Sequence, residues 1–114
     1  MKLTLCIETH DRKLGLWIVG DGNTLKSGTI VEIPGGTSIE YEGVRVRKGL
    51  GGPEILQFIV DTSINIEWAL LANWLYEKVK NKNVVGLTIN RRIVTEISAS
   101  GIRQAIEEEI RSSE

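Results

Sequence analysis

The sequence of residues 64–79 is INIEWALLANWLYEKV, and its apolar side chains recur at the spacing of an α-helix. At about 100° per residue, one set falls within an arc of about 80°: Ile64, Trp68, Leu71, Leu75 and Val79. Residues 61–63, Asp-Thr-Ser, offer oxygens that can cap the N-terminus, and Asn81 and Asn83 can end the helix in a left-handed conformation. We therefore predict a helix over residues 64–79.

The same helix carries a second apolar stripe, formed by Ile66, Leu70 and Trp74, on the side opposite the first. One sheet cannot cover both stripes. Either the helix lies between two halves of the domain, or the second stripe is a protein interface with Trp74 beside Leu70 as its anchor. Acidic residues in the wider apolar region weigh against a membrane-spanning helix: Glu54, Asp61 and Glu67.

Upstream of this helix the sequence has the patterns of β-strands. Four segments are strand-like: residues 2–10, 14–19, 29–33 and 37–41. The second has almost no polar side chain, which predicts a strand covered on both faces. An isolated Gly43 indicates a bulge, after which the last strand continues through residues 44–47. Residues 55–60 are too short and too uniformly apolar to classify, so a strand and a short buried helix both remain open.

Downstream of the helix, strands are predicted at residues 84–89 and 92–97, joined tightly through Asn90-Arg91. Ser98 or Ser100 can cap a final helix that carries its apolar side chains on one stripe: Ile102, Ile106 and Ile110. We therefore expect one α+β domain over residues 1–114. It consists of an N-terminal antiparallel β-meander followed by a helix, a β-hairpin and a C-terminal helix.

The second half of the chain has an order of features that points to a family. They are Gly51-Gly52-Pro53-Glu54, the apolar run 55–60, a helix ending in Trp74-Leu75, a basic and Asn-rich linker, a hairpin over residues 87–97 and a short Ile-bearing helix. In this order they resemble the effector-associated constant component family, small accessory proteins of bacterial conflict systems. The resemblance covers about half of the chain. It implies a non-enzymatic component that serves a separate effector, and it transfers no active-site residue.

The composition argues against several classes of function. Fourteen Lys and Arg residues stand against fifteen Asp and Glu residues, so no net positive field favours bulk nucleic-acid binding. One Cys and one His cannot supply a disulfide or a zinc site. Cys6, Glu8 and His10 share a strand face, but Cys6 and His10 lie roughly 13 Å apart along an extended strand, too far for a nucleophile and its base. We expect no catalytic residue, no metal and no cofactor.

The basic residues Arg45 and Arg47 share one face of a predicted strand, just before the glycine-rich connection at residues 48–53. They are the candidate site for a small anionic ligand or an acidic partner surface. Residues 1–13 alternate and contain Glu8 and Asp11, in place of the basic region and apolar run of a signal peptide. A cytoplasmic location is therefore the expectation.

Together these observations predict a protein-interaction or assembly module with no enzymatic activity. We expect an accessory or regulatory component that binds a protein partner and self-associates through Ile66, Leu70 and Trp74. The alternative is a sensor or sequestering protein for a small, nucleotide-like anion bound by Arg45 and Arg47.

Overall fold

A computed structural model describes residues 2–20, 25–34, 36–47, 52–61 and 67–112, without the side chains of residues 46 and 47. In chain order the elements are β1 (Lys2–Thr9), α1 (Leu14–Val19), β2 (Ile30–Ile33), β3 (Thr37–Arg47), β4 (Glu54–Asp61), α2 (Trp68–Val79), β5 (Val84–Ile89), β6 (Arg92–Ile93) and α3 (Ala99–Ser112). The predicted α+β class is confirmed.

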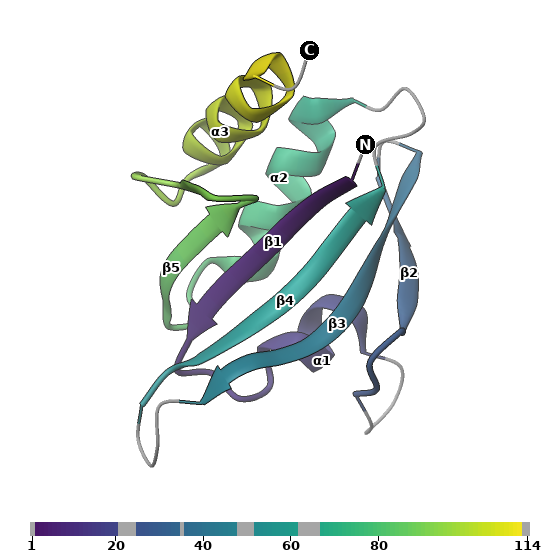
Figure 1. Cartoon of the computed structure of the whole chain (residues 1–114), viewed down its shortest axis with the longest axis vertical. Helices are drawn as coiled ribbons and strands as arrows, with labels where there is room; N and C mark the ends of the chain where they lie inside the picture. Colours follow the sequence, from purple (N-terminus) through teal and green to yellow (C-terminus); the bar gives the residue numbers. More distant parts are fainter. Residues whose placement is uncertain (1, 21–24, 35, 48–51, 62–66, 113–114) are drawn as a thin grey trace.

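The strands form a six-stranded antiparallel sheet in the order β2-β3-β4-β1-β5-β6. The consecutive strands β2, β3 and β4 are neighbours and make a meander, whereas β1 lies between β4 and β5 (Figure 1). Cys6, in the middle of β1, is opposite Gln57 on β4 and Thr88 on β5. The first strand of the chain therefore runs through the centre of the sheet.

The core lies between one face of this sheet and the helices. Alternate residues of β1 and β4 are buried there: Leu3, Leu5, Ile7, Leu56, Phe58 and Val60. Figure 1 shows α1 and α2 behind the sheet, and α3 packs against α2. On the other face of β1, Thr4, Cys6 and Glu8 are only half-buried, and no described element covers them.

Residues 14–19 were predicted as a strand, and this prediction is wrong, because they form the helix α1. The side chain of Asp11 accepts a hydrogen bond from the Lys13 amide, which begins a turn ahead of the helix. Leu14, Gly15, Ile18 and Val19 are then buried on one side. This spacing has the helical period, and Trp17 faces outward.

The other segments follow the sequence more closely. Residues 54–61 form the strand β4, which settles the alternative left open for 55–60. The register of β3 shifts at Gly43, whose φ is +135°, as expected for a bulge. Asn81 and Asn83 have positive φ as predicted, but α2 already ends before them, at the extended residue Lys80. Helix α2 begins at Trp68, and the predicted helical residues 64–66 lie outside the described part of the chain.

The second strand of the predicted hairpin is shorter than expected. Only Arg92–Ile93 form β6, although residues 92–97 were predicted to do so. The amide of Val94 still donates to the Leu87 carbonyl, but the chain then leaves the sheet to start α3. There the side chain of Ser98 accepts a hydrogen bond from the Gly101 amide over 3.0 Å. Ser98 is thus the cap that the sequence suggested.

Candidate functional site

Near the centre of the uncovered face of the sheet, β1 and β5 carry small side chains. Cys6 is the centre of this region, with Thr4 beside it on β1 and Gly86 and Thr88 on β5. Two hollows meet at Cys6, one on each side. We refer to the two hollows together as the central trough.

The first hollow of the trough is polar and basic. It has a volume of about 410 Å³ and is lined by Thr4, Cys6, Arg45, Gln57, Asn90 and Arg91. Arg45 comes from β3, whereas Arg91 comes from the turn between β5 and β6. Arg45 Nη1 donates to Gln57 Oε1 over 3.1 Å, and no carboxylate of the described residues forms an ion pair with either arginine. Two guanidinium groups that no described carboxylate pairs with therefore share one hollow.

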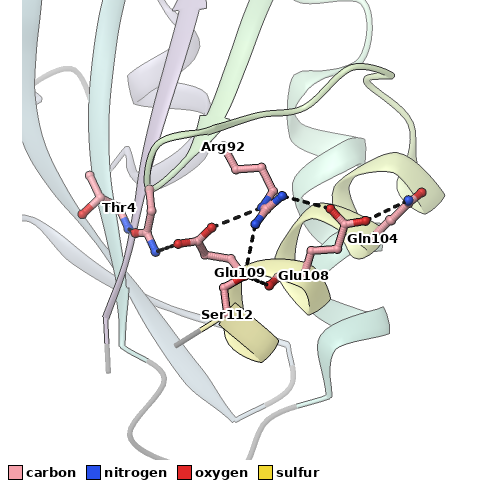
Figure 2. A network of polar contacts seen from close by, with 7 residues as sticks. Thr4, Arg92, Gln104, Glu108, Glu109 and Ser112 are labelled. Carbon is pink, nitrogen blue, oxygen red and sulfur yellow. Dashed lines mark hydrogen bonds and ion pairs between the residues drawn. The ribbon is translucent and has the colours of Figure 1, made fainter. Parts of the chain in front are cut away.

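The turn that carries Arg91 is held by a polar network (Figure 2). Asn90 Oδ1 accepts a hydrogen bond from the Thr4 amide over 2.9 Å, and Asn90 Nδ2 donates to Glu109 Oε1 over 3.0 Å. Arg92 Nε and Nη1 contact Glu109 and Glu108 of α3 over 3.2 and 3.1 Å. The charge of Arg92 is thus used to hold the hairpin against α3. Arg91 is left facing the trough.

The sequence-based candidate pair for an anion was Arg45 with Arg47. Arg45 does line a hollow, but the backbone of Arg47 ends β3 opposite Glu54, and its side chain lies outside the described part of the chain. Among the described side chains, Arg91 lines the same hollow as Arg45. Sequence reasoning missed this pair because it depends on the order of the strands across the sheet.

The second hollow of the trough is mainly apolar and has a volume of about 200 Å³. Its lining comes from four strands: Cys6, Glu8, Ile55, Gly86, Leu87, Thr88 and Ile93. Ile93 is 69% exposed, and Gly86 contributes no side chain to the floor. A polar hollow and an apolar hollow therefore adjoin on one open surface.

The predicted interface of Ile66, Leu70 and Trp74 belongs to the covered side of the sheet, on α2. Leu70 is 46% exposed, Trp74 is half-buried against the core, and Ile66 lies outside the described residues. The structure adds Trp17 of α1, which is 50% exposed. Lys78 Nζ lies 4.5 Å from the centre of the Trp17 ring and 5.7 Å from that of Trp74.

These four residues, Leu70, Trp74, Lys78 and Trp17, form what we call the helix-side stripe. Leu70, Trp74 and Lys78 follow one another at four-residue spacing on one side of α2. Lys82 Nζ lies 4.6 Å from the Trp17 ring and adds a second cation. The sequence pattern missed Trp17 because residues 14–19 were assigned to a buried strand.

The described side chains do not form a catalytic arrangement around Cys6. His10 is exposed beyond the end of β1, and its amide donates to the Asn83 carbonyl. Glu40 and Glu42 lie close together on β3, where a hydrogen bond between their carboxyl groups, desolvation and the charge of Glu40 raise the pKa of Glu42, and Lys2 opposes them. The described part of the chain holds no group of three or more His, Cys, Asp or Glu residues suited to a metal ion.

Comparisons with known proteins add no relative. No protein-family model, no curated protein and no solved structure matches this chain. Of the helices that the structure describes, none combines the length and the apolar character needed to cross a membrane.

Proposed function

We propose that this chain is a non-enzymatic protein-interaction module, an accessory or regulatory component that self-associates and binds its partner through the helix-side stripe. The observation that carries this proposal is the stripe itself. Two tryptophans and a leucine lie in line across α1 and α2, and two of the three side chains are about half exposed.

The energetics favour an interface on this surface. Exposed apolar area costs about 25 cal/mol per Å², so burying Leu70 and the Trp17 ring against a partner is favourable. Tryptophan is among the residues that contribute most to binding at interfaces. Trp74 already packs against the core, which fixes one part of the stripe before binding.

The charges around the stripe indicate the chemistry of the partner. Lys78 and Lys82 are held over the Trp17 ring, and Lys13 and Lys82 line a hollow beside it together with one carboxylate, that of Asp11. The whole chain has a net charge of -1, so this cluster is a local concentration of positive charge. A partner surface that combines carboxylates with apolar side chains would complement it.

Self-association is supported by carboxylates on the other side of the same molecule. Glu32, Glu40 and Glu42 lie on β2 and β3, on the uncovered face of the sheet, near the exposed side chain of Ile30. A second copy can therefore offer the acidic and apolar groups that the stripe requires. Because the two surfaces differ, such a contact would be heterologous.

The test is the mass of the protein in solution, measured by light scattering over a range of concentrations. Leu70→Glu places a charge at the exposed centre of the stripe and is expected to lower the mass to that of one chain while the circular dichroism spectrum is retained. Trp17→Glu should act in the same way. Trp74→Glu is less suitable, because Trp74 is half-buried against the core and the change would also destabilise the fold.

The matched control is Val85→Glu, since Val85 is 56% exposed on β5 and lies outside the stripe. This variant should associate as the wild type does. A wild-type protein that remains a single chain at all concentrations would contradict self-association. An assembly that persists in both Leu70→Glu and Trp17→Glu would remove the helix-side stripe from the interface.

A further inference from the structure

The central trough lies on the face of the sheet opposite the helix-side stripe. Its lining residues are not among the residues of β2 and β3 that are proposed to receive the stripe of a second copy. Its two hollows share Cys6 as a common wall. One end carries two arginines, and the other end is lined by Ile55 and Ile93. A ligand that filled both hollows would need an anionic group at one end and an apolar body at the other.

The basic end suits a phosphate group. Arg45 and Arg91 supply two positive charges, and a phosphate monoester carries close to two negative charges near neutral pH. Each guanidinium offers planar, paired N–H donors that match phosphate oxygens. Arg45 gives one of its donors to Gln57 and keeps the others, and no described carboxylate competes for either arginine.

Both arginines are placed by features of the backbone. The register of β3 against β4 shifts between Val44 and Val46, so Arg45 is the extra residue of a bulge. Arg91 follows Asn90, which has positive φ and is hydrogen-bonded both to Thr4 of β1 and to Glu109 of α3. The two groups are thus attached to fixed points on either side of β1 and β4, which lowers the cost of ordering them around a ligand.

The apolar end is kept open by a glycine. A Cβ atom at position 86 would lie 3.3 Å from Glu8 Oε2 and would raise the floor of the hollow. Without it, the space over Gly86 between Ile55 and Ile93 can accept a flat or narrow apolar group. Ile93 is well exposed here, so an apolar ligand would remove its side chain from water.

We propose that the central trough binds a small phosphate monoester with an apolar body. The phosphate lies between Arg45 and Arg91, and the body passes over Cys6 to the hollow between Ile55 and Ile93. This site is separate from the helix-side stripe, and its existence does not depend on the proposed protein interaction.

The reactivity of Cys6 reports on ligand binding, because Cys6 is the single cysteine of the chain and lies under the proposed ligand. The rate of its alkylation by N-ethylmaleimide is measured on the full chain with phenyl phosphate, inorganic phosphate, benzyl alcohol or phenylacetate. Phenyl phosphate should slow the reaction most and bind about tenfold more tightly than the phosphate or the alcohol alone. Phenylacetate tests whether the phosphate head is required, and it should protect Cys6 less.

Variants test which end of the trough binds the phosphate and which binds the apolar body. Arg45→Gln and Arg91→Gln should each weaken protection by phenyl phosphate about tenfold, the effect of one charge-assisted contact. Arg103→Gln is the control, because Arg103 is an exposed arginine of α3 outside the trough. Ile93→Ser should remove the advantage of phenyl phosphate over inorganic phosphate and leave the weaker protection by phosphate unchanged.

Three results would overturn the proposal. The first is that none of the four compounds slows the alkylation of Cys6. The second is that protection by phenyl phosphate survives in both arginine variants. The third is that benzyl alcohol or phenylacetate protects as well as phenyl phosphate does, since the phosphate would then have no part in binding. Circular dichroism of each variant confirms that a lost protection is not a lost fold.

Discussion

At the scale of single residues, the pair Glu40 and Glu42 shows how a solvated carboxylate can oppose folding. The pKa of Glu42 is raised above its ordinary value of 4.5 by a hydrogen bond to Glu40, by desolvation and by the charge of Glu40. The folded state therefore favours the protonated form. The contribution of Glu42 to stability is fully present below its ordinary pKa and is lost as the pH rises through the raised value.

The direction of this pKa shift predicts how the variant Glu42→Gln behaves. The raised pKa of Glu42 means that the folded state disfavours its charged form, so a neutral amide at this position should raise the melting temperature near pH 7. The difference should shrink as the pH falls towards the ordinary pKa. Melting curves over this range measure it. Glu40→Gln removes the neighbouring charge that raises the pKa of Glu42, so this variant should also melt at a higher temperature. A lower melting temperature for both variants at neutral pH would contradict the interpretation.

At the scale of elements, the hairpin of β5 and β6 depends on α3 for its position. Arg92 joins Glu108 and Glu109 across the interface, with side chains that are 35%, 40% and 20% exposed. Partial exposure limits the strength of each pair, but the network connects residues that are far apart in the sequence. Arg92→Met removes the charge and retains a long side chain.

We expect Arg92→Met to lower the free energy of unfolding by about 1 kcal/mol, which corresponds to a fall in melting temperature of roughly 4–8 °C. Arg103→Met is the matched control, because Arg103 pairs with Glu107 within α3 alone. It should cost only about 0.3–0.5 kcal/mol. Equal losses in the two variants, measured by thermal and urea unfolding, would show that the contact between hairpin and helix adds nothing beyond a local pair.

The elements also show what periodicity can and cannot predict. The stripe Leu71, Leu75 and Val79 is buried as predicted, because twelve residues of α2 are enough to show a helical period. Residues 14–19 are too few and too apolar for the sequence to distinguish the period of a helix from that of a strand. Their helix depends on the local turn at Asp11 and on a tertiary effect, the burial of one side of α1 against the sheet.

At the scale of the whole molecule, the limit of prediction was the order of the strands. The strands β2, β3 and β4 are adjacent in sequence and in space, so local turns predict their pairing. The insertion of β1 between β4 and β5 has no local signal. That insertion places Cys6 between Gln57 and Thr88 and makes Arg45 and Arg91 line one hollow. Residue types at the site were therefore readable from the sequence, but their grouping was not.

The same architecture predicts that the two proposed surfaces act independently. The helix-side stripe and the central trough lie on opposite sides of a packed core, and no described residue belongs to both. Effects of changes at distant sites without shared contacts usually add. Leu70→Glu should therefore abolish association and leave the protection of Cys6 by phenyl phosphate unchanged.

Arg91→Gln should show the reverse pattern, with weakened protection and an unchanged mass in solution. Light scattering and alkylation of Cys6 on the same two variants give the comparison. A change of both properties in Leu70→Glu, with its circular dichroism intact, would mean that the two sites are coupled, either through the sheet or because a second copy seated on β2 and β3 reaches the trough. The ligand would then act as a regulator of assembly, because a coupling free energy between two sites is reciprocal.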